Sequence, residues 1–133
     1  EHVEPDAKIL PLEDGSLDYV VCMSVLSLLE TKEAIENLIG EFHRLLKPGG
    51  KMIIDINGPE SDFATKGKFI SEDIFEYNLH EDQARPIRCY CPKTKEKFGE
   101  LFGDFIADEI GHVSFQYCGQ DSYEYVALVR KPD

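Results

Sequence analysis

The sequence has few basic residues, few cysteines and no long apolar run. Its 133 residues include 14 Lys and Arg against 26 Asp and Glu, which gives a formal net charge of −12. This acidic excess argues against a nucleic-acid binder or a binder of anionic membranes, because phosphate surfaces attract clusters of Lys and Arg. The longest apolar runs, Tyr19–Met23 and Met52–Ile54, are far shorter than the ~18 residues of a transmembrane helix. No basic segment precedes an apolar stretch at the N-terminus, so no secretory signal is predicted.

The four cysteines, Cys22, Cys89, Cys91 and Cys118, are too sparse for a small disulfide scaffold. One residue lies between Cys89 and Cys91, whereas two to four residues usually lie between paired zinc ligands. In a strand, residues two apart share a face, so both thiols are predicted to point into a core. We therefore expect reduced thiols, no metal site and a cytoplasmic location.

A composition that is 42% hydrophobic is ordinary for one globular domain or a part of one. The first residue is Glu1 and the first methionine is Met23, inside a predicted strand. The sequence is therefore expected to be a piece of a longer chain.

The clearest structural prediction is a strand, a helix and a second strand. The apolar run Leu17–Met23 is typical of a strand buried on both faces of a parallel sheet. Thr31 is the expected N-cap of the helix, and the segment Lys47–Gly50 ends it, since Pro cannot continue a helix and Gly tolerates the left-handed turn. Lys51–Ile56 is the second strand, so the unit is a right-handed parallel crossover. One helical stripe carries the apolar side chains Ile35, Leu38, Ile39, Phe42, Leu45 and Leu46.

Two interpretations of the middle of the chain stay open. Glu60–Lys68 is expected to be an exposed loop. The alternating segments Phe75–Leu79 and Ile87–Cys91 predict a hairpin with a long loop. Alternatively, Ser71–His80 is a short helix capped by Ser71.

Towards the C-terminus, Thr94 is the expected cap of a helix that closes at Gly103. Phe105–Phe115 and Tyr123–Arg130 are the expected last strands, with a turn over Gly119–Ser122. The short connection makes them antiparallel neighbours, because a parallel pair needs a longer crossover.

A series of short motifs occurs in a specific order along the first half of the chain. Taken together, this series resembles the class I S-adenosylmethionine-dependent methyltransferases, in particular the type 11 group that methylates small molecules. Its members are the segment Pro5–Leu12, the turn with Asp14 and Ser16, the strand Leu17–Met23, Glu41-x-x-Arg44 and Leu46–Gly50.

The resemblance implies an α/β fold with a Rossmann-like, mostly parallel sheet and a C-terminal antiparallel hairpin. Leu17–Met23 and Lys51–Ile56 would be the fourth and fifth of seven strands, and the first three strands would be absent. The Gly-rich turn that holds the methionine part of the cofactor would be absent with them, and no G-x-G-x-x-G-like segment occurs here. Residues 1–133 are thus expected to be the C-terminal part of a single domain, with a lid or hairpin insertion at about residues 69–92.

The same resemblance implies S-adenosyl-L-methionine as cofactor. Asp6 and the N–H of Ala7 would recognise adenine, since an acceptor beside a donor matches the edge of that base. Backbone groups of Cys22, Met23 and Ser24 would face the amino acid part of the cofactor, at the strand end where open α/β sheets bind ligands. For their side chains, a core Cys, a core Met and a capping Ser are the expected roles.

No catalytic residue is predicted. Ser27 and Leu28 stand where many relatives have histidine, and no Asn-Pro-Pro-aromatic motif follows the strand, which argues against methylation of adenine N6, cytosine N4 or glutamine. Asp55 and Asn57 end the second strand, where capping is the favoured role. Among the histidines, His43 is expected at the surface, and nothing pairs His80 or His112 with a partner at a defined spacing.

Two functions of different classes follow. The first is transfer of a methyl group to a small-molecule acceptor by the parent enzyme, with this piece inactive alone. The alternative is a non-catalytic methyltransferase-like module that acts through protein association. An oxidoreductase that binds a dinucleotide is disfavoured by the terminal hairpin and the missing fingerprint. The strand Leu17–Met23 would leave an unpaired edge, which the missing N-terminal part, a homodimer or a fold-back of Glu1–Leu12 would cover.

Overall fold

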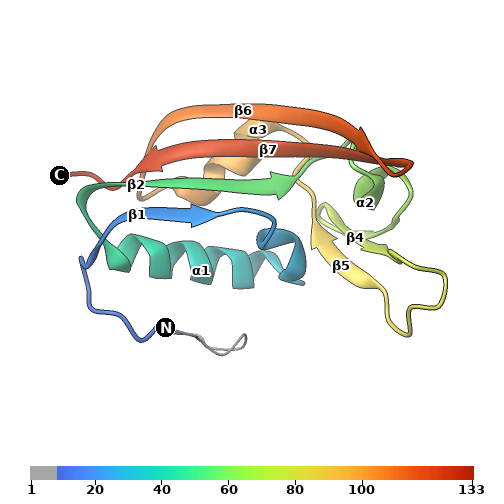
Figure 1. Cartoon of the computed structure of the whole chain (residues 1–133), viewed down its shortest axis with the longest axis horizontal. Coiled ribbons are helices and arrows are strands. Elements are labelled where there is room, and N and C mark those ends of the chain that lie inside the picture. Colours follow the sequence, from blue (N-terminus) through green and yellow to red (C-terminus); the bar gives the residue numbers. More distant parts are fainter. Residues whose placement is uncertain (1–8) are drawn as a thin grey trace.

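Residues 9–133 are described by a computed structural model that contains two sheets and several short helices (Figure 1). The larger sheet has the strand order β1-β2-β7-β6 and the smaller one the order β3-β4-β5. The strands are β1 Leu17–Cys22, β2 Leu46–Asn57, β3 Lys68–Ser71, β4 Ile74–Tyr77, β5 Ile87–Tyr90, β6 Ile106–Tyr117 and β7 Gln120–Arg130. The helices are η1 Leu26–Leu28, α1 Lys32–Leu45, α2 Asp62–Thr65, α3 Lys95–Gly99 and η2 Glu100–Phe102.

The predicted crossover unit is confirmed. β1 and β2 are parallel, with Val20 opposite Met52, and α1 connects them. The hydroxyl of Thr31 accepts the N–H of Ala34 at 3.1 Å, so it caps α1 as expected. Ile35 and Ile39 of the apolar stripe are buried against the sheet.

The second strand begins earlier than predicted, at Leu46 instead of Lys51. Gly49 adopts a left-handed φ of +75° in this segment, and its N–H donates to the carbonyl of Lys131 at 3.0 Å. The N–H of Lys131 donates in return to Gly50 at 2.8 Å. The turn after α1 is thus extended by pairing with the end of β7.

The C-terminal hairpin is confirmed, and both of its strands are longer than predicted. Its turn consists of Cys118 and Gly119, with φ values of +50° and +76°, which correct the expected turn over Gly119–Ser122. Two successive left-handed residues match the twist of hairpin strands, so the pairing continues up to the turn.

The fold class is confirmed, with its parallel part represented by β1 and β2. β7 lies beside β2 and is antiparallel to it, with Tyr125 opposite Ile56, and β6 completes the sheet. The hairpin therefore extends the sheet from its second strand.

In the middle of the chain, the expected loop is partly helical, and the choice between a hairpin and a helix is settled in favour of the hairpin. Glu60–Lys68 is not an exposed loop, because α2 forms there and buries Asp62. The hydroxyl of Ser61 donates to the carbonyl of Gly58 at 2.7 Å and helps to hold this turn. β4 and β5 form the predicted antiparallel pair, so the alternative helix over Ser71–His80 is wrong.

The helix after Thr94 is confirmed as α3 followed by η2. The Thr94 hydroxyl accepts the N–H of Lys97 at 3.1 Å. Phe98 is completely buried and contacts the ring of Phe102 edge-on, with 5.1 Å between centroids. These side chains join α1 and the sheet in one core.

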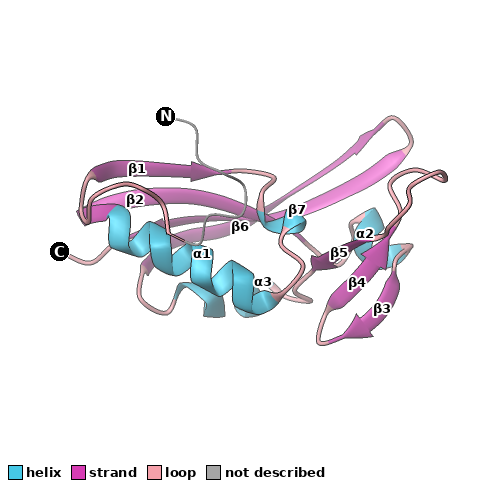
Figure 2. Ribbon diagram, turned by 90° about the horizontal axis from the view of Figure 1, so that it is seen from below, coloured by secondary structure: helices cyan, strands magenta, loops and turns pink. Residues whose placement is uncertain are grey.

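Only one face of the larger sheet is covered by helices within residues 9–133. α1 and α3 lie along the same face, where Met52, Ala127 and Val129 belong to the core (Figures 1 and 2). On the opposite face, Tyr19 and Val21 are 72% and 73% exposed. Further exposed apolar side chains alternate with the buried ones on the other strands, and they include Ile53, Leu128, Ile106, Val113 and Phe115.

Candidate functional site at the carboxyl edge of the sheet

The parallel strands β1 and β2 end at the same edge of the larger sheet, on the side of the small sheet (Figure 1). Such edges are where open α/β sheets bind ligands. Ser24 follows β1 here, and Asp55 lies near the end of β2. The N–H of Ser24 donates to Oδ1 of Asp55 at 2.7 Å. Ser24, a predicted cofactor-binding residue, is thus hydrogen-bonded to Asp55, for which only a role in capping the strand was predicted.

Ser24 has an unusual backbone conformation. Its φ is +58°, in the left-handed region that a residue with a side chain seldom adopts. Asp55 is only 2% exposed. A hydrogen bond from a backbone N–H to this buried carboxylate compensates the strain and fixes the turn between β1 and η1.

A second acidic residue lies at this edge, Glu124 of β7, and it was not predicted from the sequence. It lies opposite Asn57, on the same face as Asp55 and two residues away in register. Burial raises the pKa of Glu124, the charge of Asp55 raises it further, and so does a hydrogen bond between the two carboxyl groups. The sequence offers no local signal for this pair, because it depends on β7 pairing with β2.

The side chains of Cys22 and Met23 behave differently from each other. Cys22 is 3% exposed and belongs to the core, as expected. Burial, with a smaller effect from Asp55, raises its pKa to about 11, so the thiol stays protonated and unreactive at neutral pH. Met23 is 40% exposed, so the expectation of a core methionine is wrong.

The remaining predicted positions are less informative. Asp6 and Ala7 lie outside the described residues. Ser27 is half-buried and Leu28 exposed within η1. His43 is not a free surface histidine, because its ring packs edge-on against Phe105 at 5.0 Å.

The segment predicted as a lid or hairpin insertion forms the small sheet. Its last strand, β5, contacts η1, which follows the site. Tyr90 is buried in the main core, and the thiols of Cys89 and Cys91 are buried with Sγ atoms 3.6 Å apart. The packed end of the segment anchors it beside the carboxyl edge, and a role as a lid stays a prediction.

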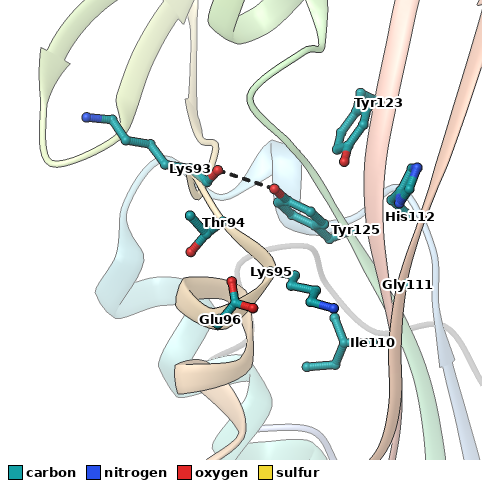
Figure 3. Close-up of a pocket in the computed structure, with 9 residues that line it drawn as sticks. All are labelled: Lys93, Thr94, Lys95, Glu96, Ile110, Gly111, His112, Tyr123 and Tyr125. Atoms are coloured by element: carbon teal, nitrogen blue, oxygen red, sulfur yellow. Dashed lines mark hydrogen bonds between the residues drawn. The ribbon is translucent and has the colours of Figure 1, made fainter.

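A cavity of about 350 Å³ lies on the helix-covered side, between the start of α3 and the hairpin (Figure 3). We call it the aromatic cavity. The rings of His112 and Tyr123 stack at 5.1 Å, and Tyr125 lies edge-on to Tyr123. Sequence analysis noted His112 and found no partner for it, because that partner comes from the neighbouring strand. The lining residues are Lys93, Thr94, Lys95, Glu96, Ile110, Gly111, His112, Tyr123 and Tyr125.

Residues 9–133 contain neither a group of side chains suited to a metal ion nor a helix suited to crossing a membrane. No cluster of three or more His, Cys, Asp or Glu side chains is placed to hold a metal ion. Of the helices in this part of the chain, none has both the length and the apolar character needed to cross a membrane.

Comparison with known proteins supports the predicted resemblance. Residues 1–54 match the family described as methyltransferase domain. This stretch holds the ordered motifs, β1, α1 and most of β2. No curated protein matches the chain.

Solved structures show the same fold at low sequence identity. A SAM-dependent methyltransferase from Methanosarcina mazei has a TM-score of 0.75 at 18% identity, covering 94% of this chain and 64% of its own. An S-adenosylmethionine-dependent methyltransferase from Clostridium acetobutylicum has a TM-score of 0.60 at 14% identity. That match covers 95% of this chain and 62% of the other. The 1,6-didemethyltoxoflavin-N1-methyltransferase of Burkholderia thailandensis was solved with 1,6-didemethyltoxoflavin and S-adenosylhomocysteine. It has a TM-score of 0.59 at 18% identity, and the match covers 90% of this chain and 46% of that enzyme. The chain thus has the Rossmann-like fold of these enzymes and spans less than two thirds of their length.

Proposed function

We propose that this chain is the C-terminal part of an S-adenosylmethionine-dependent methyltransferase that acts on a small molecule. One observation carries the proposal. The family match over residues 1–54 covers β1, α1 and most of β2, and Asp55, the next residue of β2, accepts the Ser24 N–H at 2.7 Å. The edge where this fold is expected to bind its ligand therefore contains a buried carboxylate that fixes the backbone of Ser24.

The residues present fit one part of a cofactor site. In this proposal Asp6 and the Ala7 N–H recognise adenine, and the backbone of Cys22, Met23 and Ser24 faces the amino acid part. Asp55 acts as a positioning residue, since it fixes the left-handed turn at Ser24. When bound, the cofactor supplies an electrophilic methyl group on a sulfonium.

Side chains of the chain itself would then handle the proton of the methyl acceptor. Glu124 is suited to accept this proton, because its pKa is raised towards neutral pH. A general base is most effective when its pKa lies near the pH at which the enzyme works. Positioning alone also contributes much of the acceleration in such transfers. The acceptor in this proposal is a small molecule, and neither nucleic acid nor a membrane is required.

The chain of 133 residues is expected to bind S-adenosylmethionine weakly or not at all. The sequence lacks the Gly-rich turn and the acidic residue that hold the rest of the cofactor in the proposed parent. Isothermal titration of the purified chain checks this. Binding at micromolar affinity or tighter, about −8 kcal/mol, would show that the absent elements are not needed.

The parent enzyme provides the main test. Titration of the full-length protein with S-adenosylmethionine or S-adenosylhomocysteine should give saturable binding, and Asp55→Ala should weaken it. Clean absence of binding by a folded parent would refute the proposed function.

The uncovered face of the sheet favours a second function, a non-catalytic module that acts through protein association. Tyr19 and Val21 are strongly exposed on this face, and β1 is an edge strand. In this alternative a homodimer covers the edge Leu17–Met23. The upstream reading frame discriminates the two, because a Gly-rich strand–turn–helix encoded there favours the enzyme.

We also propose a cytoplasmic location. Cys22, Cys89, Cys91 and Cys118 are all free, which is typical of a reducing compartment. Labelling of thiols in intact cells before and after reduction would check it, and a stable disulfide would contradict it.

A further inference from the structure

The aromatic cavity has the size of a small-molecule site, and one of its walls is held in place. Its volume of about 350 Å³ falls at the lower end of known ligand pockets, ~300–1,000 Å³, and suits one ring or two fused rings. Tyr125, at one wall, is 6% exposed, and its hydroxyl donates to the carbonyl of Lys93 at 3.3 Å. The ring therefore has little freedom to lose when a ligand binds.

The wall formed by the hairpin offers flat aromatic surface. The rings of His112 and Tyr123 are nearly parallel, at 11° and with 5.1 Å between centroids. Tyr125 lies at 89° to Tyr123 and 5.4 Å away. Offset-stacked and edge-on arrangements are those that aromatic rings prefer, so this wall can accept a further ring.

The hydroxyl groups determine which polar group a ligand must offer. The proton of Tyr125 is used in the bond to Lys93, as Figure 3 shows. Burial, with a smaller effect from the neighbouring Tyr123, raises the pKa of Tyr125 to about 12, so this hydroxyl keeps its proton. The Tyr123 hydroxyl also lies at the cavity (Figure 3), and a phenol oxygen can accept a hydrogen bond. A matching ligand presents a hydrogen-bond donor to it.

The charge of the lining favours an acid. The ammonium of Lys93 is engaged by Asp73 at 3.6 Å. Lys95 forms no ion pair with any residue of 9–133, and its ammonium lies near Ile110 at the cavity wall (Figure 3). Glu96 is the only carboxylate in the lining. In a chain of net charge −12, an ammonium at the cavity that has no ion-pair partner within residues 9–133 is a selective feature for an anion.

We propose that the aromatic cavity binds a planar aromatic acid with a hydrogen-bond donor at its far end. The ring lies against His112 and Tyr123, the carboxylate meets Lys95, and the donor meets the Tyr123 oxygen. 4-Hydroxybenzoate is the simplest compound of this class. The site belongs to this chain and does not depend on the proposed methyl transfer.

Titration of the 133-residue chain with 4-hydroxybenzoate, followed by ¹⁵N–¹H correlation spectra, tests the site. We expect saturable shifts at residues 93–96, 110–112 and 123–125, with a Kd on the order of 1 mM for so small a ligand. Lys95→Glu should weaken binding by about fivefold or more. The matched control Lys51→Glu makes the same charge change on the opposite face, where Lys51 is exposed, and should leave the Kd unchanged.

Analogues test the polar contacts separately. The neutral 4-hydroxybenzamide should bind more weakly because it lacks the charge, and benzoate should bind more weakly because it lacks the donor. Absence of saturable shifts in a well-dispersed spectrum would overturn the proposal. So would equal losses in the two lysine variants, since binding would then follow net charge alone, or equal affinity for all three compounds.

Discussion

Asp55 and Glu124 are two carboxyl groups held together on one face of the sheet at its carboxyl edge. They come from β2 and β7, and the pKa of Glu124 is raised above its ordinary value of 4.5 by burial and by Asp55. A carboxyl whose pKa is raised by folding keeps its proton in the native state after the unfolded state has released it. The free energy of unfolding therefore falls as the pH rises from the ordinary pKa of Glu124 through its raised pKa in the folded chain.

Glu124→Gln should increase the stability of the chain above that pH window, because glutamine cannot lose a proton. Melting temperatures at about pH 8 should be higher for the variant than for the natural chain, and at about pH 4 the difference should largely vanish. Glu109→Gln, on the exposed part of β6, is the matched control and should show no such dependence. An equal effect of both substitutions would mean that only net charge is involved.

Asp55→Ala should destabilise the chain by about 1–3 kcal/mol, because the partly buried N–H of Ser24 loses its acceptor. Asp55→Asn keeps an oxygen at the same place and should retain more stability than Asp55→Ala. Urea unfolding followed by circular dichroism measures both. An alanine variant as stable as the natural chain would show that the left-handed turn at Ser24 holds without this bond.

At the scale of elements, Arg44 explains why Glu41 and Arg44 occur together in the sequence. Arg44 on α1 donates to the carbonyls of Leu10 and Leu12, at 3.1 and 2.9 Å. It also pairs with Asp14 at 2.6 Å and with Glu41 at 2.9 Å. The hydrogen bond from Arg44 lowers the pKa of Glu41, and that carboxylate accepts the Leu10 N–H. One helix face thus holds the segment that leads into β1.

Arg44→Met should release this segment while α1 itself remains folded. Limited proteolysis should then cleave residues 9–14 faster than in the natural chain, with the rest of the chain equally resistant. Lys47→Met is the control, since among residues 9–133 Lys47 pairs with the exposed Asp18 alone, at 2.9 Å. If the two variants were cleaved at equal rates, Arg44 would not be what holds the segment.

For the whole molecule, β1 is one of the two edge strands of the larger sheet within residues 9–133, and β6 is the other. The segment at Leu10 and Leu12 is held by α1, so this part of the chain does not fold back over the edge. The edge amides and the apolar side chains of Tyr19 and Val21 are a template for another chain. The prediction that this edge becomes covered therefore still stands.

Val21→Lys tests that prediction. Val21 is 73% exposed, so the charge costs little in the monomer, and it disfavours association through this edge. Light scattering after size exclusion should show concentration-dependent association of the natural chain and less association of the variant. A well-folded natural chain that stays monomeric, with amides of residues 19–22 exchanging rapidly, would contradict it.

The sequence by itself determined the elements whose signals are local. Thr31 and the apolar stripe of α1 define that helix, because capping and the 3.6-residue period act within a few turns. The last two strands form a hairpin because a short connection permits only an antiparallel pair. The ordered motifs of residues 5–50 were enough to predict the fold, which the structure confirms.

Only the tertiary structure decided which distant residues meet. The placement of β7 beside β2 brings Glu124 to Asp55, and the pairing of β6 with β7 stacks His112 on Tyr123. Asp62 became buried because α2 packs near β4 and β7. The physical reason is that a strand's alternation fixes which side chains share a face, while its partner and register depend on contacts far along the chain.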